Sequence, residues 1–190
     1  LRKQFLEDRW GPASSVFLFL QVLHRHRNMI RILSLAFVLI WSIGIFSQDI
    51  PAIELKDLSD MTVDTRALVE DAEGPVLFCF WATWCSPCKR ELNNYADLYP
   101  DWQDETGVEI VAVSIDDPRS MMRVKPYVNS VSWDYTILLD PNKAFARAMQ
   151  VNNVPHTFLV DTNGEVVWQH NNYADGDEDE LYEELLKLSE

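Results

Sequence analysis

Cysteine and histidine are scarce in this chain of 190 residues, and their scarcity excludes several kinds of site. Three cysteines are too few for a disulfide-stapled scaffold. A structural zinc site would need a second pair of Cys or His ligands beside the single C-x-x-C pair. After residue 28 the only histidines are His156 and His170, and the only other cysteine is Cys79. We therefore expect no structural metal site.

Basic residues are also few in most of the chain. Residues 1–48 hold six of the 16 Lys and Arg and two of the 30 Asp and Glu, which leaves ten basic and 28 acidic residues, a formal charge of −18, for residues 49–190. We expect no nucleic-acid partner for so acidic a segment. The acidity suits a solvated surface that keeps an exported monomer soluble, or a docking face for a basic partner.

The first 48 residues differ from the rest in composition. Residues 1–28 mix apolar and basic stretches unlike a folded domain, so we expect Met29 to be the natural start. A short basic stretch and an apolar run of 15 residues, 32–46, then follow the layout of a secretory signal. The run is shorter than the ~20 residues of a spanning helix, so an uncleaved anchor is the second choice. We expect a leader over 1–48, with the signal or anchor over 29–48, and one extracytoplasmic domain over 49–190.

Strand and helix patterns alternate along residues 49–190, which predicts an α/β fold. The expected strands are a short hairpin at 53–56 and 61–63, followed by 75–81, 108–115, 135–139, 156–160 and 166–170. The expected helices are a turn at 65–69, a long helix from Cys85 that Pro100 kinks or ends, a helix from 116 to about 128 interrupted or tilted by Pro126, a helix over 141–149, and a last helix from about 178.

Cys85-Ser86-Pro87-Cys88 stands where a continuous apolar strand gives way to a helix. Two thiols separated by two residues can close a small disulfide ring, and the unpaired N–H groups and positive dipole end of a helix N-terminus favour a thiolate on Cys85. The pattern predicts a redox switch in which Cys85 attacks and Cys88 resolves, with no bound cofactor because the dithiol is the redox centre. Cys79, inside the apolar strand, is expected to be a small buried residue.

The segment 81–89, Trp-Ala-Thr-Trp-Cys-Ser-Pro-Cys-Lys, resembles the active-site segment of the thioredoxin superfamily. Glu91, three residues after Cys88, and the distant Val-Pro-His-Thr at 154–157 make the chain more similar to its TlpA/ResA-like extracytoplasmic thiol-disulfide oxidoreductases. The likeness runs from about Ile53 to the C-terminus. It implies a three-layer α/β/α sandwich with an N-terminal β-hairpin and a central insertion between residues 117 and 149.

The resemblance also implies roles for individual residues. Pro155 is the expected cis-proline facing the disulfide, which leaves the backbone of Val154 free to pair with an extended substrate segment. Trp84 and Pro87 are expected to contact the substrate at the rim of Cys85, although an aromatic beside a core strand is as often packing. Glu91 is expected to modulate the acidity of the thiols, and the alternative is a solvated carboxylate on the helix surface.

Neither Ser86 nor Pro87 adds a positive charge that would hold the Cys85 thiolate, so we expect a reductase with a potential nearer about −270 mV than about −120 mV. The resemblance implies a membrane thiol carrier as electron donor and protein disulfides, including those of apocytochromes awaiting haem, as clients. One alternative is a copper-binding chaperone that uses Cys85, Cys88 and His156, although such relatives space their cysteines three residues apart. A thiol peroxidase is weaker, because no Pro-x-x-x-Thr-x-x-Cys segment precedes the pair.

Overall fold

The structure, a computed structural model, describes residues 49–131 and 133–189. The expected leader therefore lies outside the described residues. The strands are β1 (Glu54–Asp57), β2 (Thr62–Asp64), β3 (Val76–Trp81), β4 (Glu109–Ser114), β5 (Thr136–Leu139), β6 (His156–Val160) and β7 (Val166–Asn171). The helices are α2 (Thr65–Glu70), α3 (Ser86–Thr106), the 3-10 helix η1 (Met121–Arg123), α4 (Val124–Val131), α5 (Ala144–Ala148) and α6 (Asp177–Ser189).

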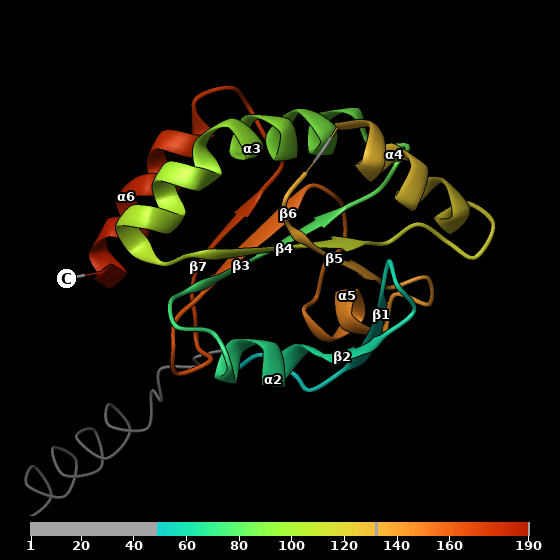
Figure 1. The fold of residues 1–190 in the computed structure, drawn as a ribbon, viewed down its shortest axis with the longest axis horizontal. Helices are drawn as coiled ribbons and strands as arrows, with labels where there is room; N and C mark the ends of the chain where they lie inside the picture. The colour runs from blue at the N-terminus through green and yellow to red at the C-terminus, as the bar shows by residue number, and fades with distance from the viewer. Residues whose placement is uncertain (1–48, 132, 190) are drawn as a thin grey trace, which may run out of the picture. The chain divides into compact units, whose positions relative to one another are not determined.

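The strands form one seven-stranded sheet in the order β2-β1-β5-β4-β3-β6-β7. Strands β3, β4 and β5 are mutually parallel, β6 runs antiparallel to β3, and the predicted hairpin joins the sheet through β1 on β5. Helices α3, α4 and α6 lie on one face of the sheet and α2 and α5 on the other (Figure 1). The predicted three-layer α/β/α architecture is confirmed, and η1, α4, β5 and α5 occupy the expected insertion.

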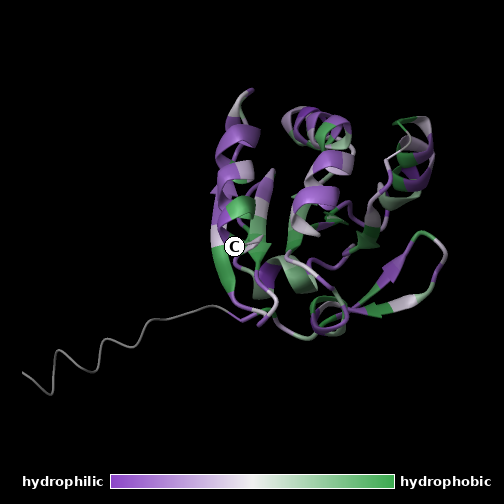
Figure 2. Cartoon of the chain, turned by 60° about the vertical axis from the view of Figure 1, so that its left-hand side comes forward, coloured by the Kyte–Doolittle hydropathy of each residue, from purple (hydrophilic) through white to green (hydrophobic). Residues whose placement is uncertain are grey.

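The core is built on β3, whose six residues are all buried because helices cover both faces of the sheet. Figure 2 shows the hydrophobic colour in the strands at the middle of the sheet, whereas the helices mix both colours. Side chains alternate between the two faces of a strand. Phe78 and Phe80 contact Phe145 of α5, with ring centroids 5.3 and 5.2 Å apart. Cys79 and Trp81 therefore point to the other face, toward α3 and α4.

Two expectations about helices are corrected by the structure. Pro100 is expected to kink or end the long helix, but it does not end α3, which continues to Thr106. Pro100 itself is exposed, while Tyr95 and Trp102 on either side of it are buried and hold the helix in place. The helix expected from residue 116 begins only at Val124, after η1. The carboxylate of Asp117 instead accepts hydrogen bonds from the N–H groups of the two residues after Pro118, which closes a turn.

Candidate functional site

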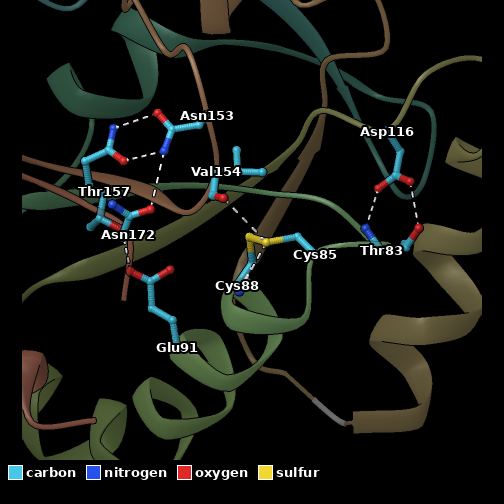
Figure 3. Close-up of a disulfide and its surroundings, with 10 residues drawn as sticks. Thr83, Cys85, Cys88, Glu91, Asp116, Asn153, Val154, Thr157 and Asn172 are labelled. Atoms are coloured by element: carbon cyan, nitrogen blue, oxygen red, sulfur yellow. Dashed lines mark hydrogen bonds between the residues drawn. A yellow bond between two sulfur atoms is a disulfide. The ribbon is translucent and has the colours of Figure 1, made fainter. Parts of the chain in front are cut away.

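Cys85 and Cys88 form a disulfide at the N-terminus of α3, with their Cα atoms 5.4 Å apart (Figure 3). Cys85 is the N-cap residue of α3 and directly follows the loop at the carboxyl end of β3. Its side chain is 5% exposed, whereas that of Cys88 is fully buried. Cys85 is thus the more exposed of the two cysteines, as the predicted order of attack requires.

The start of the helix also affects the acidity of Cys85. The backbone N–H of Cys88 donates a hydrogen bond to Cys85 Sγ at 3.3 Å. Once the disulfide is reduced, the same N–H and the positive end of the α3 dipole stabilise negative charge on this sulfur. Pro87, half-buried in the first turn, is tolerated there because its missing N–H would have had no partner within the helix.

The peptide bond between Val154 and Pro155 is cis, as the resemblance implies. Because β6 runs antiparallel to β3, its first residue, His156, lies beside Phe80 at the same sheet edge as the disulfide. The carbonyl oxygen of Val154 is 3.7 Å from Cys85 Sγ, and Figure 3 shows this oxygen directed at the sulfur pair. In the reduced protein the Cys85 thiol can donate a hydrogen bond to this oxygen.

A cluster of asparagines, not predicted from the sequence, ties down the segment that contains Val154. Asn153 and Asn171 exchange two amide hydrogen bonds, of 2.7 and 3.2 Å, and Asn153 also donates to Asn172 Oδ1 at 3.4 Å. The N–H of Asn172 donates to the carbonyl of Pro155 at 2.9 Å. These bonds attach residues 153–155 to the end of β7 on both sides of Val154. The only sequence signal is the Asn pair at each site, 152–153 and 171–172.

Glu91 is buried beneath the disulfide edge and is not the solvated carboxylate of the alternative interpretation, because it is 1% exposed. Its Oε1 accepts hydrogen bonds from Thr157 Oγ1 at 2.9 Å and from the Tyr95 hydroxyl at 3.3 Å, and no described residue donates to its Oε2. Burial raises the pKa of Glu91 to about 8; the two hydrogen bonds oppose the rise and the charge of Asp177 adds to it. The side chain can therefore gain or lose a proton near neutral pH.

Cys79 lies next to this carboxyl group, as the partner of Thr157 in the pairing of β3 with β6. It is fully buried, and burial, followed by repulsion from Glu91, raises the pKa of its thiol. A buried thiol of raised pKa is unreactive, which agrees with the structural role expected for Cys79.

Trp84 is 60% exposed beside Cys85 and is therefore not packed into the core. The preceding Thr83 is held by Asp116, which follows β4: the N–H and hydroxyl of Thr83 donate to its two carboxylate oxygens at 2.7 and 2.6 Å (Figure 3). Ser114 donates to the same carboxylate at 3.0 Å. Asp116, which the sequence analysis did not single out, thus fixes the loop that presents Trp84 and Cys85.

His156 directs both ring nitrogens away from the cysteines. Nε2 lies 3.3 Å from Gln169 Oε1, and Nδ1 lies 3.3 Å from the side-chain nitrogen of Asn171. Burial lowers the pKa of the imidazole. Within the part of the chain that the structure describes, no group of three or more His, Cys, Asp or Glu side chains is arranged to hold a metal ion. The copper alternative therefore gains no support from the position of His156.

Comparison with known proteins agrees with the fold and with the cysteine pair. Residues 46–169 match the AhpC/TSA family. The thiol-disulfide oxidoreductase ResA of Halalkalibacterium halodurans is 30% identical over 135 residues, which are 70% of this chain and 71% of that protein. ResA of Geobacillus thermodenitrificans is 35% identical over 109 residues, 57% of this chain and 61% of that protein, so the chain spans about three fifths of such relatives.

Solved structures give the same result. A thioredoxin-like protein from Porphyromonas gingivalis is 43% identical with a TM-score of 0.67, over 75% of this chain and 93% of that one. A thiol:disulfide interchange protein from Bacteroides sp. is 26% identical with a TM-score of 0.59, over 75% of this chain and 89% of that one. The chain belongs to the AhpC/TSA family and, within it, to the ResA-like thiol-disulfide oxidoreductases.

Proposed function

We propose that this chain is a protein thiol-disulfide oxidoreductase whose redox centre is the Cys85–Cys88 pair. The observation that supports this most directly is the disulfide at the start of α3, with the more exposed sulfur of Cys85 facing the carbonyl of Val154 beside a cis-proline. Membership of a family of thiol-disulfide oxidoreductases adds to it.

The reaction transfers two electrons in two exchanges. The Cys85 thiolate attacks one sulfur of the client disulfide, which forms a mixed disulfide and releases the other client sulfur as a thiolate. Cys88, as a thiolate, then attacks Cys85 Sγ, which closes the Cys85–Cys88 disulfide and releases the second client sulfur. Cys88 must lose a proton before this step, and we propose that Glu91, one helical turn away and with a pKa of about 8, takes part in handling it.

The client is proposed to bind as an extended segment along Val154. The asparagine contacts fix residues 153–155 from the side of β7, and this supports a backbone that is ready to pair with another strand. Trp84, exposed, and Pro87, half-buried, are proposed to contact the client at the rim.

The direction and place of the reaction are part of the same proposal. We propose a reductase that works outside the cytoplasm, with a leader over 1–48 and a domain over 49–190, supplied with electrons by a membrane thiol carrier. Protein disulfides, including those of apocytochromes in cytochrome c maturation, are the proposed clients. Among residues 49–131 and 133–189, no helix is long and apolar enough to cross a membrane.

The reduction potential of the protein and trapping of its clients test this proposal. We expect a potential nearer about −270 mV than about −120 mV, and a value near the second figure would contradict the direction. Cys88→Ser should accumulate mixed disulfides on Cys85, and Cys85→Ser should abolish turnover with the fold unchanged by circular dichroism. A Cys85→Ser variant that remained active would assign the attacking sulfur elsewhere. Stoichiometric, tight binding of copper by the reduced protein would favour the chaperone instead.

A further inference from the structure

A hollow of about 400 Å³ opens beside Trp84. Its walls come from the segments that follow the three parallel strands: Trp84 after β3, Ile115 and Arg119 after β4, and Lys143 after β5, with Arg123 from η1. The carboxyl ends of parallel strands meet at one edge of a sheet, where α/β folds bind their ligands. The hollow therefore lies on the edge that presents the disulfide, and it begins one residue from Cys85.

The charge of this hollow is opposite to that of the domain. Three of the ten basic residues in 49–190, Arg119, Arg123 and Lys143, line it, although the segment has 28 acidic residues. All three are exposed, and among the described residues no carboxylate forms an ion pair with any of them. The one acidic residue of the lining, Asp117, accepts three hydrogen bonds from its own turn on Oδ1 and interacts electrostatically with Arg119. Three basic residues against one acidic residue still leave the lining positive.

The hollow also has an apolar side. Trp84 is 60% exposed in its wall, and Met122, which precedes Arg123 in sequence but does not line the hollow, is 80% exposed. Large exposed apolar side chains near positive charge are typical of surfaces that bind protein segments. The three cations favour a segment with carboxylates, and they disfavour one with Lys or Arg.

We infer that this hollow binds an acidic side chain of the client, close in sequence to the client cysteine that Cys85 attacks. The inference rests on the proposed function and adds to it a substrate class, acidic segments that flank a disulfide. The electrostatic preference acts on the encounter as well as on the bound state, so it should weaken as salt rises.

The test measures rate constants for reduction of peptide disulfides by the reduced full chain. Three peptides of equal length have Asp and Glu, Asn and Gln, or Lys beside the cysteine. We expect the acidic peptide to react about fivefold faster than the neutral one at low salt, and the Lys peptide to be slowest. The double variant Arg119→Gln with Arg123→Gln should lose this preference while its rate with the neutral peptide stays unchanged.

The double variant Lys56→Gln with Lys187→Gln is the matched control, because it also removes two positive charges and neither residue lines the hollow. It should keep the preference of the parent chain. The inference is overturned if the parent chain does not prefer the acidic peptide. It is also overturned if the variant Arg119→Gln with Arg123→Gln keeps that preference. Reduction of the uncharged 2-hydroxyethyl disulfide tests the proposed function alone. If the chain does not reduce this compound, the proposed function and the docking site are both refuted. If it reduces the compound but shows no preference for the acidic peptide, only the docking site is refuted.

Discussion

Replacing Glu91 by glutamine tests whether this carboxyl group is held neutral in the folded protein. Among residues 49–131 and 133–189 no ion pair is formed by this buried side chain, and its two hydrogen-bond donors, Thr157 and Tyr95, both reach Oε1. Glutamine has nearly the shape of the protonated acid and cannot ionise. The variant therefore keeps the neutral side chain at every pH, whereas the parent must ionise Glu91 when the pH exceeds its pKa.

The magnitude follows from the pKa. Burial raises it from an ordinary value of 4.5 to about 8, so the folded state binds this proton more tightly than the unfolded state does. Protonated Glu91 contributes stability that is fully present below about pH 4.5 and is lost as the pH rises to about 8. The total loss of unfolding free energy over this range is roughly 5 kcal/mol. Glu91→Gln should therefore match the parent near pH 4.5 and exceed its stability by up to about 5 kcal/mol at pH 9.

Urea unfolding of the oxidised chain between pH 4.5 and 9 measures this difference. In the oxidised state Cys85 and Cys88 do not titrate. Glu91 raises the pKa of Cys79 and of Tyr95, but burial alone already raises both pKa values, so neither group ionises in the folded protein over this pH range. Glu183→Gln, at an exposed position of α6, is the control and should show no comparable trend. A difference between Glu91→Gln and the parent that stays constant over the whole range would refute the assignment of a raised pKa.

Four further variants test the scaffold of the site and of the fold. Asn153→Ala should slow reduction of a protein disulfide by about threefold to tenfold, because Val154 is no longer held, with little change toward 2-hydroxyethyl disulfide; equal losses with both substrates would argue against this. Asp116→Ala should lower the free energy of urea unfolding by about 3 kcal/mol, since the half-buried donors of Thr83 and the buried hydroxyl of Ser114 lose their acceptor. Gly74→Ala should cost about 3 kcal/mol because its Cβ would collide with a backbone carbonyl, whereas Gly176→Ala, which meets no neighbour but has a φ of 105°, should cost about 1 to 2 kcal/mol.

The elements that the sequence predicts well are those with a strong local pattern. Strand β3 is an unbroken apolar run, and the Cys-Ser-Pro-Cys motif marks the start of α3. The end of the helix that Pro100 predicts does not occur, because local propensity takes no account of the buried neighbours that hold α3 against the sheet. The helix after β4 was misjudged because the Asp117 turn competes with helix formation.

The contacts that complete the site depend on strand register, which no local pattern contains. Asn153 meets Asn171, 18 residues later, only because β7 pairs with β6. Whether Glu91 faces water or Thr157 depends on how α3 lies across β6, since a position three residues after Cys88 suits either environment. Neither the contact of Asn153 nor the environment of Glu91 can be predicted from the sequence, because in each case the partner residue belongs to a distant strand.

The first described residues join the sheet at the edge opposite the one that carries the disulfide. The N–H of Ile50 donates to the carbonyl of Gly164 in the turn between β6 and β7, and Asp49 pairs with Glu165. That turn lies at the opposite end of β6 from Pro155, hence at the far edge of the sheet from the sulfurs. The first described residues therefore leave the edge that carries Cys85 uncovered, and a partner can approach the dithiol from that side.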